Sequence, residues 1–242
     1  MPTQKARSRA GDSSGDRQAR PVRITVSKED YLKAIAEGTA GGETVIPATL
    51  ARWLRISPPA VTAALRRLRR DGLVRAGKGA GVALTARGHV VANHLLLRHH
   101  LIERMLSEMF GMEWFKVHEE AERLEHAVSE DFERRLIAVL GEGMPCPHGN
   151  LAGGESPEKR RRRGWLRLNE VSSRAAYSVA AVDERDRQFL EFLDSLGLRP
   201  NARFTWLSSN IDDTVTLEME SGPCRVGRSA AAKVWVKQAP AA

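Results

Sequence analysis

The sequence predicts a mainly α-helical protein with β elements: an N-terminal helical unit with a strand pair, a helical middle and a C-terminal domain of short strands. Three observations lead to this fold class. Apolar residues recur at helical spacing from about residue 26 to residue 141, with one short strand pair among them. The composition then changes sharply at "GEGMPCPHGNLAGGESPEKRRRRG", where Gly, Pro and Arg dominate. Beyond this segment, apolar residues alternate over short runs, which is typical of strands.

The composition limits the kinds of partner and compartment. The chain has 242 residues, a net charge of +8 and a pI near 10.0, which favour nucleic acid or another polyanionic surface as partner. No window approaches the run of roughly 18 apolar residues that a membrane span needs, so we expect no membrane segment. The two cysteines, Cys146 and Cys224, are far apart in the sequence. This argues against a disulfide scaffold and against a thiolate zinc site, and it suits a reducing cytoplasm.

The N-terminal unit should contain three helices and a β-wing. Residues 1–22 carry almost no apolar side chains and are expected to form a disordered basic tail. We expect helices over "VSKEDYLKAIAEG", with Ser27 as N-cap and Gly38 as the stop, over "PATLARWLRI" and over "SPPAVTAALRRLRRDGL". The stretch "VRAGKGAGVALTARG" predicts two strands around a Gly/Lys turn. Helices and wing in this order predict a winged helix-turn-helix over 23–88, a module that inserts a helix into the major groove of DNA.

The third helix of this unit is the expected recognition helix. Val61, Leu65 and Leu68 form its apolar inner face, so its polar and basic residues point outward. The candidates for DNA contact on it and on the wing are Thr62, Arg66, Arg67, Arg70 and Lys78. Arginines at the far end of the helix suit phosphate contacts, and residues near its start can reach base edges. The alternative interpretation is a solvated basic face without a partner.

The middle of the chain, over 89–142, is expected to be helical and to bind metal. Six of the seven histidines lie between His89 and His126. On a long helix predicted over 87–110, His99 and Glu103 share one face, and a turn at Gly111 should fold the next helix back so that His118 lies beside them. A His/Glu/His set on two helices is a workable site for a divalent ion.

A second ligand set lies further along the next helix. In "KVHEEAERLEHAVSED", the residues His118, Glu122, Glu125 and His126 fall at i, i+4, i+7 and i+8, which places them on one face of a helix. Asp30 on the first helix is the candidate for a further ligand. Two other interpretations remain open: the stripe could be a polar interface, or the protein could be a helical metallohydrolase with Glu119 or Glu120 as general base.

A Pro/Gly/Arg-rich linker is expected over 143–163, and a small SH3-like β-barrel over 164–242. The strands of this barrel are expected at "GWLRLNEV", "AAYSVAAVDE", "RFTWLSS", "TVTLEME" and "AKVWVK", around one helix at "RDRQFLEFLDSLGL".

The segments "DYLKAI", "RDGLV", "HHLIERML", "KVHEEAERLEHAVSEDFERRL" and "PHGN" resemble the metal-dependent repressors typified by the diphtheria toxin repressor and the manganese transport regulator. The resemblance runs from about Val26 to Gly149, and more loosely through the C-terminal domain. It implies a metal-activated, DNA-binding homodimer that takes no small organic substrate and is not an enzyme. Two metal sites follow from it: His99, Glu103 and His118 in one, and Asp30, Glu122, Glu125 and His126 in the other. It also places Ser57, Pro59 and Thr62 near base edges.

The departures from the iron-type members bear on which metal binds. Asp30 and Glu122 stand where those members carry Met and Cys, so hard carboxylates replace soft sulfur and favour Mn²⁺, with Fe²⁺ as the alternative. The position at which small manganese regulators carry a second carboxylate holds Lys33. In the barrel, Gln188 matches a residue that reaches the metal in the family, whereas its acidic companion is replaced by Arg185. We further expect that without metal the clustered carboxylates repel one another and keep the first helix loose.

Overall fold

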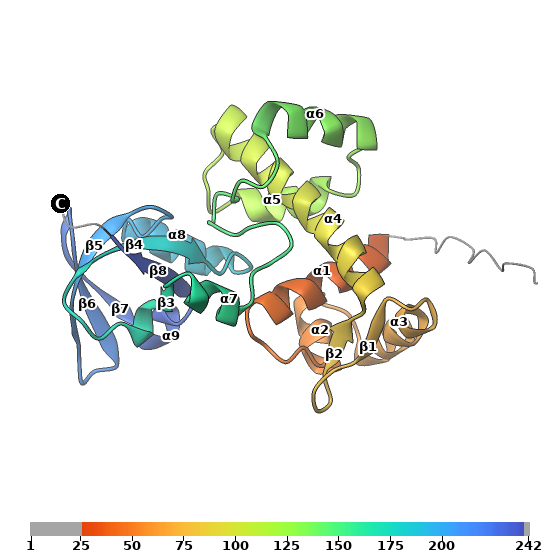
Figure 1. The fold of residues 1–242 in the computed structure, drawn as a ribbon, viewed down its shortest axis with the longest axis horizontal. Coiled ribbons are helices and arrows are strands. Elements are labelled where there is room, and N and C mark those ends of the chain that lie inside the picture. Colours follow the sequence, from red (N-terminus) through yellow and green to blue (C-terminus); the bar gives the residue numbers. More distant parts are fainter. Residues whose placement is uncertain (1–25, 240–242) are drawn as a thin grey trace, which may run out of the picture.

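The computed structural model describes residues 26–239, so the tail predicted over 1–22 lies outside the described residues. The chain forms three parts in sequence order, and the helical middle part lies above the other two in the view of Figure 1. The long helix α4 (Ala86–Arg104) runs from the winged helix into this middle part (Figure 1). Among the described residues, no helix has both the length and the apolar character that crossing a membrane requires.

The N-terminal part has the winged-helix order of elements that the sequence predicts. These elements are α1 (Val26–Ala40), α2 (Pro47–Trp53), α3 (Pro58–Arg70), β1 (Val74–Ala76) and β2 (Val82–Leu84), with the two strands paired antiparallel. Both predicted ends of α1 are wrong. Ser27 lies within the helix, and the helix continues past Gly38. Gly38 is needed for packing, because a Cβ atom there would lie 2.6 Å from the Trp53 ring and from Val45.

The middle part consists of α4, a π-helical turn η1 (Met105–Met109), α5 (Val117–Leu124) and α6 (Glu130–Leu140). The hydroxyl of Thr85 caps α4 by accepting a hydrogen bond from the backbone nitrogen of Gly88 at 3.0 Å. The helix predicted from Lys116 ends earlier than its pattern suggests, because α5 stops at Leu124, whereas the helix predicted at "SEDFERRLIAVLG" is confirmed as α6. Glu125 and His126 therefore lie in the turn between α5 and α6.

The C-terminal part contains the predicted strands and helix. Its elements are β3 (Leu166–Arg167), η2 (Leu168–Glu170), β4 (Ala176–Val182), α8 (Arg187–Ser195), β5 (Arg203–Ser209), β6 (Thr214–Met219), β7 (Gly222–Gly227), α9 (Arg228–Ala231) and β8 (Val234–Gln238). The strands form one antiparallel six-stranded sheet in the order β3-β8-β4-β5-β6-β7. Irregular pairing between Val179 and Ala181, and between Trp206 and Ser208, increases its twist and bend. The apolar core that α8 shares with the sheet includes the fully buried Leu190 and Leu217.

The segment predicted as a linker over 143–163 does connect the two domains, but it is packed and not free. Cys146 and His148 are buried, and α7 (Pro157–Arg162) holds the buried Arg160 between the Trp165 and Trp235 rings. Gly and Pro content indicates an irregular backbone, but it does not indicate whether tertiary contacts bury the segment. This packing brings Cys146 and His148 to the helical middle part of the molecule.

Candidate metal centre and DNA-binding helix

The first candidate metal group joins α4 to α5. His99 and Glu103 lie one turn apart on α4 and are fully buried, and His118 on α5 is buried as well. Three of their atoms form a triangle in which each distance is 3.0 Å: Nε2 of His99, Oε1 of Glu103 and Nδ1 of His118. Gly111 makes the turn between the helices with a φ of +65°. The structure thus brings together the three residues that the sequence predicts as one group.

These three atoms have the spacing that ligands of one ion need. Ligand atoms that bind an ion at about 2.1 Å and at right angles are about 3 Å apart. The second oxygen of Glu103, Oε2, is buried without a hydrogen-bond partner among the described residues. A buried carboxylate oxygen is costly unless a donor or a cation satisfies it. The group therefore fits a divalent cation.

The second candidate group joins α1 to the turn after α5. Asp30, Glu125 and His126 offer ligand atoms that all lie within 4.8 Å of one another. Nε2 of His126 is 3.0 Å from Oδ1 of Asp30 and 3.7 Å from Oε1 of Glu125. The other ring nitrogen of His126, Nδ1, lies 2.9 Å from Oε2 of Glu29. A carboxylate at Nδ1 fixes the ring and leaves Nε2 for an ion, which is the usual arrangement of a metal-bound histidine.

Two of the predicted ligands lie outside these groups. Glu122 is more than half exposed, and its Oε1 lies 3.7 Å from both Lys33 Nζ and His118 Nε2. It lies at the edge of both groups and could join either by rotation of its side chain. Gln188 is exposed near the start of α8 and belongs to none of the candidate groups of the described residues.

Lys33 is buried beside the second group and contacts one of its members, Glu125. Its ammonium lies 3.0 Å from Glu125 Oε2 and 2.9 Å from His99 Nδ1. Among the carboxylates there is thus a positive charge that offsets their repulsion. Helix α1 packs on α4.

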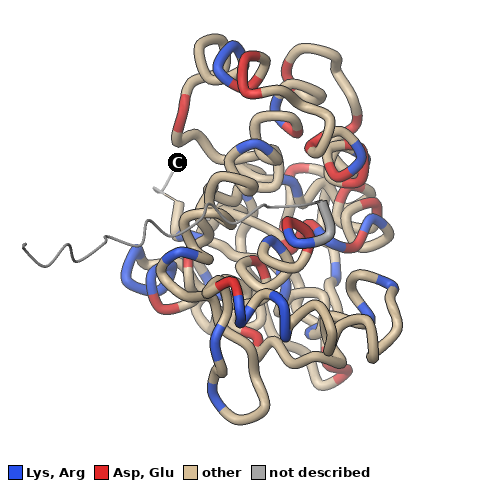
Figure 2. The backbone as a smooth tube through the Cα atoms, turned by 90° about the vertical axis from the view of Figure 1, so that its right-hand side faces the viewer, with Lys and Arg blue, Asp and Glu red and all other residues tan. Residues whose placement is uncertain are grey.

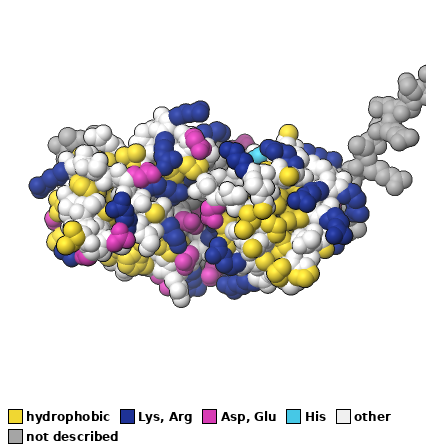
Figure 3. All heavy atoms as spheres, turned by 90° about the horizontal axis from the view of Figure 1, so that it is seen from below, with side chains coloured by type: hydrophobic (Ala, Val, Ile, Leu, Met, Phe, Trp, Pro, Cys, Tyr) yellow, Lys and Arg dark blue, Asp and Glu magenta, His cyan; other side chains and the backbone are white. Residues whose placement is uncertain are grey.

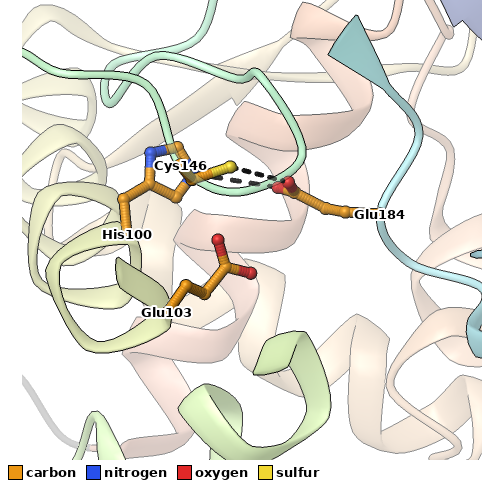
Figure 4. A group of neighbouring side chains, drawn as sticks. All are labelled: His100, Glu103, Cys146 and Glu184. Atoms are coloured by element: carbon orange, nitrogen blue, oxygen red, sulfur yellow. Dashed lines mark hydrogen bonds and ion pairs between the residues drawn. The ribbon is translucent and has the colours of Figure 1, made fainter. Parts of the chain in front are cut away.

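A third group includes residues that the sequence analysis did not propose together. Its four members are buried and place ligand atoms within 4.8 Å of one another (Figure 4). They are His100 and Glu103 on α4, Cys146 in the connecting segment and Glu184 after β4. Sγ of Cys146 lies 3.3 Å from Oε2 of Glu184, and Nε2 of His100 lies 3.7 Å from its Oε1. Glu103 belongs to this group and to the first one, so the two form one continuous polar centre.

His148 completes this centre. Its Nε2 donates a hydrogen bond to the backbone oxygen of Trp114 at 2.8 Å. Its Nδ1 therefore faces inward, 3.3 Å from Glu184 and 3.5 Å from Glu103. The cysteine count argued against a thiolate zinc site; the structure places Cys146 among carboxylate and imidazole groups and not with another thiol. The spacing Cys146-x-His148 was the sequence signal that could have revealed it.

The centre carries both signs of charge when no ion is present. Burial alone would lower the pKa of His148, but Glu103 and Glu184 outweigh it and raise that pKa to about 10. Burial would raise the pKa of Glu125, but His99 and Lys33 hold it at about 2. Burial, together with Glu184 and Glu103, holds the pKa of the Cys146 thiol well above its ordinary value. A metal ion at this centre would therefore displace protons.

The recognition helix α3 has its apolar face inward and its basic face outward, as predicted. Val61, Ala64, Leu65 and Leu68 are buried. The candidate DNA contacts Ser57, Pro59, Thr62, Arg66, Arg67, Arg70 and Lys78 are all exposed. Lys and Arg are concentrated in the lower half of Figure 2, which includes the winged helix, and they gather at the winged-helix end of the face seen in Figure 3. Among the described residues, the outward face of α3 is thus exposed and positively charged.

The fold and the site together define a metal-dependent, DNA-binding transcriptional repressor. Residues 23–82 match the iron dependent repressor N-terminal DNA binding domain, residues 85–152 match the iron dependent repressor metal binding and dimerisation domain, and residues 166–238 match the FeoA domain. The chain belongs to the family of the iron-dependent repressor IdeR and the diphtheria toxin repressor, whose members are not enzymes.

Relatives and solved structures differ in the metal named for them. The iron-dependent repressor IdeR of Mycobacterium leprae is 35% identical over 188 residues, which cover 73% of this chain and 82% of that protein. The diphtheria toxin repressor of Corynebacterium diphtheriae is 38% identical over 126 residues, or 52% of this chain and 56% of that one. The manganese regulator SloR has a similar structure, with a TM-score of 0.73 and 29% identity over 88% of this chain and 98% of that one. A manganese-dependent transcriptional repressor in complex with manganese gives a TM-score of 0.75 and 30% identity over 88% of this chain and all of that one.

Proposed function

We propose that the protein is a manganese-activated repressor of metal-homeostasis genes, with Mn²⁺ as co-repressor. One observation carries this proposal: Asp30 lies on α1 of the winged helix, whereas Glu125 and His126 lie in the dimerisation domain. An ion held by these three residues connects the DNA-reading part to the part that sets the dimer. Fixing that connection fixes the orientation of α3.

The ligand atoms favour manganese over iron. The second group offers two carboxylates and one imidazole, and its Asp30 has oxygen where the resemblance to iron-type members places sulfur. Glu122, at the edge of the group, is a second such replacement. The likeness to structures named as manganese regulators supports the same metal. The iron(II)-dependent repressor is the second candidate, because IdeR is the relative with high coverage and Cys146 adds a softer ligand to the third group.

The residues of the site would hold two ions with different structural roles. Asp30, Glu125 and His126 would hold the ion that links the domains, and Glu29 orients the ring of His126. A second ion would fix the dimerisation domain to the C-terminal sheet. It would be held by Glu103, His118 and His99, together with the neighbouring set of His148, Cys146 and Glu184. Gln188 would reach this centre only after α8 moves. A bound cation supplies positive charge that neutralises the carboxylates.

Operator DNA and a second copy of the chain are the proposed partners. Ser57, Pro59 and Thr62 at the start of α3 suit base edges, and Arg66, Arg67 and Arg70 suit phosphates, together with Lys78 in the wing. In the dimerisation domain, Val90, Phe132 and Val139 are 70%, 42% and 68% exposed. These exposed apolar side chains lie in the region that matches the metal binding and dimerisation domain, so they support a symmetric dimer. In such a dimer, the two α3 helices meet DNA half-sites about one helical turn apart.

The metallohydrolase interpretation has no support. Its proposed general bases are engaged in surface ion pairs, Glu119 with Arg187 at 3.4 Å and Glu120 with Arg123 at 2.6 Å. Neither belongs to a candidate metal group of the described residues.

The substitution Asp30→Ala tests the proposal. It should abolish Mn²⁺-dependent operator binding in a gel-shift titration, while circular dichroism and sedimentation show an intact fold and dimer. Asp131→Ala is the matched control, because Asp131 is an exposed carboxylate on α6 that pairs with Arg134. A parallel anaerobic titration with Fe²⁺ distinguishes the two metals. Unchanged manganese dependence in Asp30→Ala would refute the proposal.

A further inference from the structure

Lys33 lies beside the second metal group and contacts its Glu125 carboxylate. It is 5% exposed, and three elements surround its ammonium: its own helix α1, α4 through His99, and the turn after α5 through Glu125. Nζ lies 3.0 and 3.2 Å from the two oxygens of Glu125, 2.9 Å from Nδ1 of His99 and 3.7 Å from Oε1 of Glu122. Lysine is rarely buried to this extent unless its charge is paired.

The surrounding carboxylates keep this amine charged. Burial alone would lower the pKa of Lys33, but Glu37, Glu125 and Glu122 outweigh burial and raise the pKa above its ordinary value. The amine belongs to α1, and so to the DNA-reading part of the molecule.

The ammonium uses the same ligand atoms that a metal ion needs. Oε1 of Glu125 faces both Nζ at 3.2 Å and Nε2 of His126 at 3.7 Å, so it lies between the lysine and the Asp30 group. A divalent ion bound by Asp30, Glu125 and His126 would lie close to a like charge in a buried setting, where repulsion is strong. It would also have to draw a carboxylate oxygen away from the ammonium.

From this geometry we infer that Lys33 is a built-in cation that competes with the metal ion for Glu125 and sets how much metal the Asp30 site requires. This inference rests on the proposed metal site at Asp30. In the metal-free protein, Lys33 holds α1 to α4 and to the turn after α5. When metal is abundant, an ion takes Glu125 and the lysine is left with Glu37 and Glu122. The result is a weaker Asp30 site, filled only when the metal concentration is high.

The substitution Lys33→Met tests this inference, because Met keeps most of the apolar stem and removes the charge. Metal-free protein is titrated with MnCl₂ in a calorimeter, and the binding step that Asp30→Ala removes is assigned to the Asp30 site. We expect this step to become at least tenfold tighter in Lys33→Met. We also expect the metal-free variant to unfold at a lower temperature than the metal-free wild type, with the difference much reduced at saturating Mn²⁺. Lys28→Met is the matched control on the same helix, because Lys28 pairs with Asp71 at 2.9 Å, away from the Glu125 carboxylate.

Each other outcome is decisive. A manganese affinity that is unchanged or weaker in Lys33→Met would overturn the inference, and so would a variant that fails to fold even with Mn²⁺, because the lysine would then act in packing alone. A variant that is unfolded without metal and restored by Mn²⁺ would support it. If wild-type protein has no binding step that depends on Asp30, the proposed function fails, and this result is distinct from a failure of Lys33 to compete.

Discussion

His99 and Glu125 are joined by a short contact of 2.6 Å between Nδ1 and Oε2, which links α4 to the turn after α5. The other nitrogen of His99, Nε2, lies 3.0 Å from Glu103. One imidazole therefore connects the Asp30 group to the group around Glu103. Because an imidazole fixed at one nitrogen is also oriented at the other, occupancy of either group should influence the other.

Replacing His99 should therefore weaken both metal-binding steps. We expect His99→Ala to lower the Mn²⁺ affinity of each step at least tenfold, which is the usual cost of removing a ligand or its orienting partner. Calorimetric titration of the metal-free dimer measures both steps. His89→Ala is the control, since His89 is an exposed histidine on the same helix. If only one step changes, the two groups are independent.

Cys146 should decide how strongly the third group discriminates between metals. A thiolate favours Zn²⁺ and other softer ions, whereas carboxylates suit Mn²⁺. Cys146→Ala should lower Zn²⁺ affinity by a larger factor than Mn²⁺ affinity, as measured by competition with a chromophoric chelator. Cys224→Ala is the matched control, because Cys224 is half-buried in β7 and lies outside the candidate metal groups of the described chain. Equal losses would mean that the thiol does not discriminate between the metals, and unchanged affinities would mean that it is not a ligand.

Sequence periodicity could predict the first group and not the third. His99 and Glu103 lie one helical turn apart, and a glycine turn returns the chain toward them, so local rules suffice to place His118. Cys146 and Glu184 meet His100 only because the connecting segment and the loop after β4 pack on α4, and no local pattern encodes such long-range packing. For the same reason, the sequence shows that Lys33 replaces the second carboxylate of small manganese regulators, but it does not show that the lysine amine lies between Glu125 and His99. Glu125 and His126 were assigned to a helix because the helical pattern continues through them, but α5 ends at Leu124.

The basic face of α3 should contribute to DNA binding through phosphate charge. Arg66→Ala should weaken operator binding in saturating Mn²⁺ and reduce the slope of log affinity against log salt by about 1 for each lost contact, with Mn²⁺ binding unchanged. Fluorescence anisotropy over a series of NaCl concentrations measures this slope. Arg225→Ala removes an equal charge from β7 and should leave the slope as it is. A slope unchanged in Arg66→Ala would place this residue outside the interface.

Manganese binding should release protons and become tighter as the pH rises. His148 and Cys146 both carry a proton at neutral pH in the metal-free protein, because the pKa of His148 is raised to about 10 and that of Cys146 is raised well above its ordinary value. A metal ion can bind these atoms only after the protons leave. Calorimetry in buffers of different ionisation enthalpy measures the number released, and a value of zero would exclude both residues as ligands. Cys146→Ala should reduce this number, whereas Cys224→Ala should not.

The metal-free protein should be most stable in mildly acidic solution. Burial would lower the pKa values of His99 and His148, but their carboxylate neighbours raise them to about 9 and about 10, above the unfolded value of 6.5. The stabilisation from these two groups is therefore fully present below pH 6.5 and is lost as the pH rises through 9 and 10. For Glu125 the pKa is lowered from 4.5 to about 2, so its contribution is present above pH 4.5 and is lost as the pH falls toward 2.

These two limits place the maximum of the free energy of unfolding between pH 4.5 and 6.5. By pH 10 this free energy should fall by an amount on the order of a few kcal/mol. Urea unfolding of chelator-treated protein at pH 5.5 and 9.5 measures this loss. His148→Gln should flatten the alkaline part of the profile, because a neutral side chain has no proton to lose, whereas His89→Gln on the exposed face of α4 should leave it unchanged. Wild-type protein that is equally stable at both pH values would contradict the assignment of charged imidazoles to the buried centre.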